Sequence, residues 1–355
     1  MSILFLGVWP LYSFFKIIPY PGLIHVQGTI SLTIGSFAIG FLLTALPRFT
    51  ETNHASRVTV YSLLGISFVE LMVLLLGYSS YAFLFLAIKF FGIFIFAIPR
   101  FLKRKNPIPP SFIWVVFAVL YAVIGGVGTW LSPSLLFTSF LTQGFMTSLF
   151  LGIGGKLIPV LTGVSNGLIV EKKYHRYDMI FHGLLAITFF ISLYFQHTLD
   201  WVRWGMSIKS MVLIVEVVFF WKLYRAPIKS SRAWLLWVAT WLLPVAQVTA
   251  ILFPVWNLHI EHLMFVGTFL VGTVVVASHV IVSHQGFSQD LLKKYRPLGL
   301  IGMILFFAGL TRVIAPLLTY ENQLGHAGLL AVSALLYWGF IFLRPFVENK
   351  KLHNY

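Results

Sequence analysis

Apolar residues fill most of the chain in runs of about 20, and short polar segments separate the runs. Such runs predict transmembrane helices, because about 20 helical residues cross a hydrocarbon core and a helix satisfies its own backbone hydrogen bonds. The predicted fold class is all-α: a polytopic membrane helical bundle of about 12 transmembrane helices, forming one domain over residues 1–355. The twelve spans are expected near residues 3–19, 24–46, 57–77, 80–98, 112–131, 134–161, 179–197, 205–223, 233–254, 261–283, 298–319 and 326–344.

Basic residues gather in alternate loops between these spans. The positive-inside rule then predicts that both termini are cytoplasmic and that the chain makes six hairpins. The net charge of +15 is therefore an orientation signal, and membrane lipid rather than nucleic acid is the expected partner. The clusters are Arg100, Lys103, Arg104 and Lys105; Lys172, Lys173 and Arg176; Lys222, Arg225, Lys229 and Arg232; Lys293, Lys294 and Arg296; and Lys350 and Lys351.

Composition limits the chemistry that such a bundle can perform. Hydrophobic residues make up 59% of the chain and charged residues 10%, against about 25% charged residues in a soluble domain. There is no cysteine, which excludes disulfides, thiolate metal ligands and iron–sulfur clusters. The 11 histidines are consequently the only strong ligands for a transition metal.

The stretch from His262 to His284 combines a membrane span with three imidazoles and contains no charged residue. Its two end histidines are 22 residues apart, which is roughly 33 Å of helix, about one hydrocarbon core. They differ by roughly 40° around the helix axis, so both can face the same interior, whereas His279 is displaced by roughly 100° the other way.

The predicted topology sorts the histidines into two layers. A single histidine at a span end is more often an interfacial polar residue than a ligand, but several at two levels favour metal or haem. Haem requires one or two axial imidazoles, an apolar slot and donors for its propionates, whereas copper prefers several imidazoles in one cluster. The outer layer holds His25, His197, His259, His262 and His326, and the inner layer holds His54, His175, His182, His279, His284 and His353.

Four ionisable residues lie within predicted spans, where charge is costly and usually faces protein. Glu70 and Lys89 lie on consecutive spans at similar depths, which predicts an ion pair. Lys209 and Glu216 are seven residues apart on one helical face, as expected for a structural pair, a proton path or a propionate site.

Several segments together resemble the NnrS family of multi-pass haem- and copper-associated proteins linked to nitric oxide. His25 lies fifteen residues before the sequence GFLLTALPRFT of residues 40–50, the family's spacing, although Gln27 and Gly28 stand where the family often has His and Glu. The sequences GGKLIP at 154–159 and TRVIAP at 311–316 resemble later family elements. His262, Gly267, Thr273, His284 and Gly286 match the family's histidine-bounded span, in which His279 stands where Arg is common.

The resemblance implies a haem b protein of the cell inner membrane, with copper as an additional metal, acting in nitric oxide metabolism or protection from nitrosative stress. His25 and His262 would be outer ligands, with His284 and His182 at the inner level, and Arg312 would pair with a propionate. His25, His262 and His284 are also the candidate metal ligands. Haem in both layers would suit electron transfer from quinol to nitric oxide, as in a reductase; one site would suit a sensor or scavenger.

Two other functions fit the same residues. A transporter for a metal ion, haem or a small anion would use Glu70, Lys89, Lys209 and Glu216 for gating or coupling, with discontinuous helices and an internal repeat. A structural subunit without a cofactor would leave the histidines merely interfacial.

Overall fold

The computed structural model describes residues 2–78, 81–165, 175–198, 201–227, 229–284, 296–318 and 320–348. Every regular element in these ranges is helical, which confirms the all-α fold class. Ten helical segments among these residues are long and apolar enough to cross a membrane, so the chain is a multi-pass membrane protein. They are Gly22–Thr50, Arg57–Leu75, Ala82–Leu102, Pro110–Leu131, Leu135–Leu161, Arg176–Thr198, Ser231–Leu252, Pro254–Ser283, Arg296–Leu317 and Tyr320–Leu343.

The other two predicted spans are helical but shorter or more polar. The first is α1 (Ser2–Ser13), which ends well before residue 19. The second is α10 (Val202–Val215), continued by the π-helix η5 (Glu216–Phe220), and it carries Lys209 and Glu216. About 12 transmembrane helices therefore agree with the structure.

Contacts group the chain into two compact units, which are described separately. Unit 1 comprises residues 1–5, 22–156 and 169–205, and unit 2 comprises residues 6–21, 157–168 and 206–355. Three of the boundaries fall inside helices, namely α1, α8 and α10.

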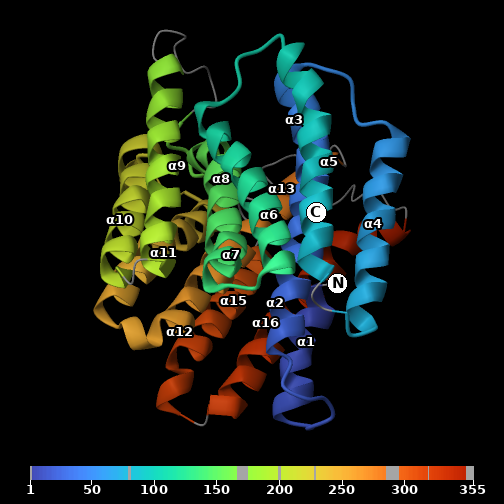
Figure 1. Cartoon of the computed structure of the whole chain (residues 1–355), viewed down its shortest axis with the longest axis vertical. Helices are drawn as coiled ribbons and strands as arrows, with labels where there is room; N and C mark the ends of the chain where they lie inside the picture. The colour runs from blue at the N-terminus through green and yellow to red at the C-terminus, as the bar shows by residue number, and fades with distance from the viewer. Residues whose placement is uncertain are drawn as a thin grey trace. The chain divides into compact units, whose positions relative to one another are not determined.

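In unit 1, α5 packs against α3, α4 and α6 (Figure 1). Gly126 of α6 allows a close approach, because a Cβ there would overlap the main-chain carbonyl of Phe83. The elements are α2 (Gly22–Gln27), η1 (Gly28–Gly35), α3 (Ser36–Thr50), α4 (Arg57–Leu75), α5 (Ala82–Leu102), η3 (Pro110–Phe112), α6 (Ile113–Leu131), α7 (Leu135–Ser139), η4 (Phe140–Phe145), α8 (Met146–Leu161) and α9 (His175–Thr198).

In unit 2, α15 packs against α16, α12 and η8. Gly302 of α15 permits close contact with α11, where a Cβ would overlap the Leu235 side chain. The elements are η6 (Leu223–Arg225), α11 (Ser231–Leu252), η7 (Pro254–Trp256), α12 (Asn257–His262), η8 (Leu263–Leu270), α13 (Val271–His284), α15 (Arg296–Ile314), η9 (Ala315–Leu317) and α16 (Tyr320–Glu348).

At one end of unit 1, the last turns of α3 and α5 each bind the segment that follows the other helix. The amide of Lys105 donates to the carbonyl of Thr50 at 3.1 Å, and Arg100 donates to the carbonyl of Asn53 at 3.0 Å. This agrees with a topology in which both segments lie on the same side of the membrane.

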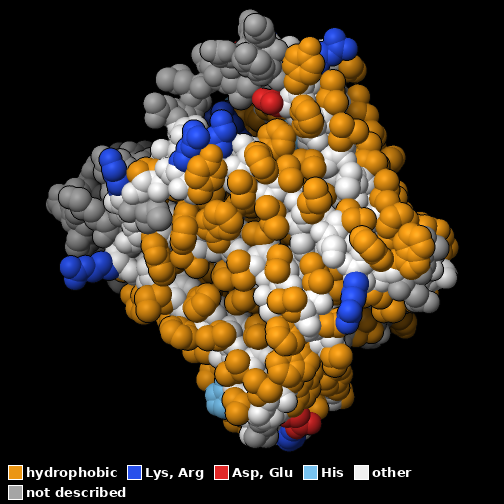
Figure 2. Space-filling view, turned by 90° about the vertical axis from the view of Figure 1, so that its left-hand side faces the viewer, with side chains coloured by type: hydrophobic (Ala, Val, Ile, Leu, Met, Phe, Trp, Pro, Cys, Tyr) orange, Lys and Arg blue, Asp and Glu red, His pale blue; other side chains and the backbone are white. Residues whose placement is uncertain are grey.

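Hydrophobic side chains cover most of the face shown in Figure 2, and Lys and Arg are sparse there. Elsewhere in the described chain, Phe91, Phe94 and Ile95 of α5 are also exposed, in a helix with only two basic residues. A surface of this kind is matched to lipid chains rather than water.

Candidate functional site

His25 is held in a defined orientation by the backbone. It is the fourth residue of α2, and its Nδ1 lies 2.9 Å from the main-chain carbonyl oxygen of Phe5. A carbonyl only accepts hydrogen bonds, so Nδ1 carries a proton, and in a neutral ring Nε2 carries the lone pair. Metal-ligating histidines commonly have this arrangement, because the Nδ1–H bond fixes both the ring and the tautomer.

His262 shows the same arrangement in unit 2. It is the last residue of α12, and its Nδ1 donates to the main-chain carbonyl of Leu258 at 2.7 Å. The edge-to-face contact with Phe265, at 5.8 Å between ring centroids, restrains the ring further. Nε2 is again the nitrogen that can accept a proton or bind a metal.

Both histidines precede a π-helix. A six-residue α-helix holds His25 before η1, and another holds His262 before η8; each π-helix has eight residues. π-Helical turns are rare and are frequent at functional sites, because they break the regular backbone hydrogen-bond pattern. The sequence gives no signal for them, since both segments are as apolar as an ordinary membrane helix.

Arg312 lies in a cluster with one histidine that sequence reasoning did not select. Its guanidinium donates to Nδ1 of His259 and lies over the ring of Tyr320, with Cζ 5.7 Å from the centroid. The rings of His259 and Tyr320 meet edge to face at 5.7 Å. Because guanidinium only donates, the proton of a neutral His259 is on Nε2, the opposite tautomer to that of His262.

His279, like His259, accepts a hydrogen bond at Nδ1, whereas Nδ1 of His262 donates one. Its Nδ1 lies 3.4 Å from a guanidinium nitrogen of Arg232, which donates to it. A neutral His279 therefore carries its proton on Nε2. The contact with Arg232 agrees with the prediction that His279 faces a different neighbour, and whether it is a ligand stays a prediction.

The inner-level candidates are only partly described. His182 is a buried side chain in α9. His284 ends α13, but its side chain lies outside the described residues, as does all of His353. His25 belongs to unit 1 and His262 to unit 2, so their expected partnership stays a prediction.

No group of three or more His, Asp or Glu side chains close enough to hold a metal ion occurs within the described parts of the chain. A haem iron needs only one or two axial imidazoles, so the haem prediction does not depend on such a cluster. The copper prediction stays a prediction.

The buried charges of unit 1 form the predicted ion pair. Lys89 Nζ lies 2.5 Å from Glu70 Oε2, and both side chains are fully buried. Lys89 also donates to the main-chain carbonyl of Ser31 at 3.1 Å, and the Ser31 hydroxyl donates to Glu70. Since Ser31 belongs to η1, these two hydrogen bonds attach the ion pair to the π-helix that follows His25.

In unit 2, buried Lys209 interacts electrostatically with Glu261 of α12, a residue that the sequence analysis did not single out. Glu216 is fully buried in η5. Lys209 therefore interacts with a residue of another helix, and the roles predicted for Lys209 and Glu216 on their shared helical face stay predictions.

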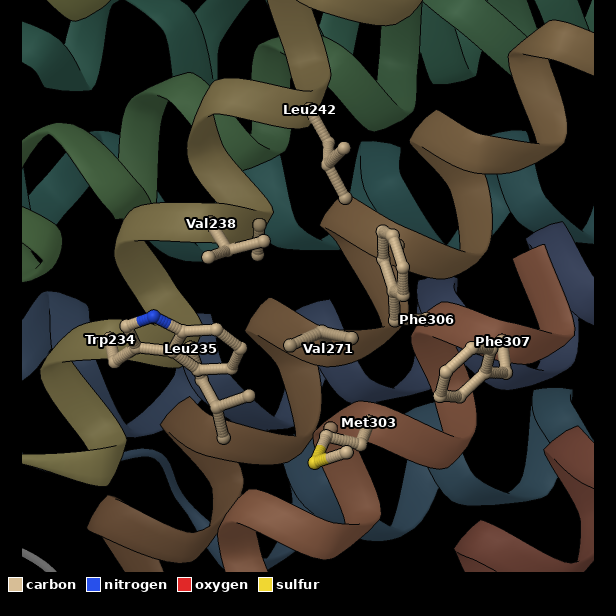
Figure 3. Close-up of a pocket in the computed structure, with 11 residues that line it drawn as sticks. Trp234, Leu235, Val238, Leu242, Val271, Met303, Phe306 and Phe307 are labelled. Atoms are coloured by element: carbon tan, nitrogen blue, oxygen red, sulfur yellow. The ribbon is translucent and has the colours of Figure 1, made fainter. Parts of the chain in front are cut away.

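An apolar cavity of about 270 Å³ lies between α11, η8, α13 and α15 (Figure 3). Its lining includes Trp234, Leu242, Val271, Met303 and Phe306 and contains no imidazole or carboxylate. Such a cavity can take an apolar group but cannot by itself ligate a metal.

The sequence matches the family model described as NnrS protein over residues 1–349. No curated protein and no solved structure matches the chain. The family match covers nearly all of the chain and confirms the resemblance that the separate motifs predicted.

Proposed function

The chain belongs to the NnrS family, and from this premise we propose that it is a haem b protein of the cell inner membrane that acts in nitric oxide metabolism or protection from nitrosative stress. The observation that carries the proposal is the shared geometry of His25 and His262. Each donates Nδ1–H to a main-chain carbonyl, the arrangement in which Nε2 is the ring nitrogen that would bind iron.

The residues fit haem better than a cluster-bound metal. The tautomer-fixed imidazoles of His25 and His262 would each hold a haem iron, and buried Arg312 would pair with a propionate. When bound, a haem supplies an iron that binds nitric oxide. The chain's own contribution is to orient the imidazoles and to exclude water with apolar helices.

His182 and His284 are proposed as ligands at the inner level. Haem at both levels would let electrons from quinol cross the membrane, which suits a nitric oxide reductase, whereas haem at one level suits a sensor or scavenger. Copper bound by His25, His262 or His284 is the second metal to be tested.

The test is a redox difference spectrum with iron and copper counts on protein purified after haem supply. We expect a b-type Soret band that is lost or shifted in His25→Ala and His262→Ala and unchanged in His54→Ala. His54 is the matched control, because it lies between helices in the segment after α3. Wild-type protein without a Soret band would refute the haem proposal.

A transporter is the second candidate function, and the fully buried Glu70–Lys89 pair is the observation that favours it. Haem-free protein that gives a flux in proteoliposomes, lost on Glu216→Gln, would favour transport over haem chemistry.

A further inference from the structure

The cluster of Arg312, His259 and Tyr320 in unit 2 has the features of an anion site. We propose that it binds an oxyanion, either a carboxylate or a phosphate group. Arg312 comes from the end of α15, His259 from α12 and Tyr320 from the start of α16, so three helices contribute one residue each.

The charge balance of this cluster is the first argument. Arg312 is 7% exposed, yet no carboxylate of the described chain lies within ion-pair distance of it. The acidic residues nearest in sequence are engaged elsewhere: Glu321 pairs with Lys16, and Glu261 interacts with Lys209. A buried cation is costly without a counter-charge, and a bound anion would supply one.

The hydrogen-bond donors are the second argument. Because Arg312 donates to Nδ1, the other ring nitrogen of a neutral His259 is a donor. His259 and Tyr320 do not use all five N–H groups of the guanidinium, and the others form a planar set that suits the oxygens of an oxyanion. The Tyr320 phenol oxygen accepts a hydrogen bond from Arg312, and its own O–H is a further donor.

The cluster is also accessible. Tyr320 is 37% exposed and His259 is half-buried, so the site reaches the surface of unit 2 while its cation stays inside. An anion at the surface can therefore meet the side chains of His259 and Tyr320.

The two sources of such an anion differ in what they imply. His262 lies one turn beyond His259, and its carbonyl oxygen is 3.7 Å from the Cβ position of Gly309, one turn before Arg312. A haem carboxylate near His262 is one source, and it rests on the proposed function. The phosphate of a lipid headgroup is the other source and does not.

The experiment measures the melting temperature of purified protein in increasing potassium propionate or phosphate, with potassium chloride at equal ionic strength as the reference. Haem-free protein is used first. We expect both oxyanions to raise the melting temperature of wild type beyond the chloride reference, and we expect no such rise in Arg312→Met.

Arg225→Met is the matched control, because Arg225 also lies over a tyrosine ring, at 5.3 Å from that of Tyr224, but is exposed. It should respond as wild type does. Tyr320→Phe, which keeps the ring and the charge, should need about tenfold more anion, as expected for a lost hydrogen bond to a charged group. This variant tests the site even if Arg312→Met does not fold.

The site is refuted if chloride stabilises wild type as well as the oxyanions do, or if Arg312→Met and Tyr320→Phe respond like wild type. If haem loading abolishes the response, the occupant is a haem carboxylate. If the response survives and native mass spectrometry finds an anionic phospholipid on wild type but not on Arg312→Met, the occupant is a lipid phosphate. If the protein does not bind haem, the proposed function is refuted. The melting temperatures of haem-free wild type and variants still test whether the oxyanion site exists.

Discussion

Lys89 Nζ lies 2.5 Å from Glu70 Oε2, and neither side chain is exposed. Glu70 lies in α4 and Lys89 in α5, and both are hydrogen-bonded to Ser31 of η1. The ion pair therefore connects three helical segments of unit 1. Burial makes each charge dependent on the other, because neither has water as an alternative partner.

Removal of one partner should therefore cost far more than removal of both. We expect Glu70→Leu to lower the free energy of unfolding by about 3–5 kcal/mol, and Glu70→Leu with Lys89→Met to recover most of it. Denaturant unfolding in detergent measures both. Glu321→Leu is the control, because it breaks an exposed ion pair with Lys16 and should change little. A single variant as stable as the double one would contradict the argument.

Gly28 couples the π-helix to His25. A Cβ at this position would overlap the ring of Phe5, whose carbonyl accepts the His25 Nδ1–H. Gly28→Ala should therefore displace Phe5, lower stability by about 1–3 kcal/mol and shift the haem spectrum. Gly40→Ala is the matched control, since nothing lies within 4 Å of a Cβ there. Equal spectra and stability for the two variants would show that Phe5 does not position His25.

Lys209 and Glu261 should be coupled energetically although they lie in different helices. A double-mutant cycle of Lys209→Met and Glu261→Gln is expected to give an interaction energy of about 0.5–3 kcal/mol, as for residues that share an electrostatic contact. The same cycle on Lys209 and Glu216 should give a smaller value. Strict additivity for Lys209 and Glu261 would contradict the assignment.

The absence of cysteine makes the predicted topology directly testable. Lys103→Cys, in the basic segment after α5, should react with an impermeant maleimide only when the cytoplasmic face is exposed. Tyr78→Cys, after α4, should react only from the opposite face. Labelling of both from one face would refute the predicted orientation.

The sequence by itself determined the membrane spans and one buried contact. Apolar runs of about 20 residues allow few alternatives to helices, since the bilayer supplies no hydrogen-bond partners for the backbone. Glu70 and Lys89 were predictable as a pair, because adjacent helices joined by a short turn place residues of similar depth side by side. The family motifs likewise selected His25, His262 and Arg312 without a structure.

Only the tertiary structure decided how those residues are used. The tautomers of His25 and His262 depend on carbonyls of Phe5 and Leu258 that their own sequence motifs do not specify. Arg312 donates to His259, 53 residues away in the chain, and Lys209 interacts with Glu261 of another helix. Hydropathy fixes that a residue lies in the membrane, but which polar group it meets depends on how the helices rotate and pack.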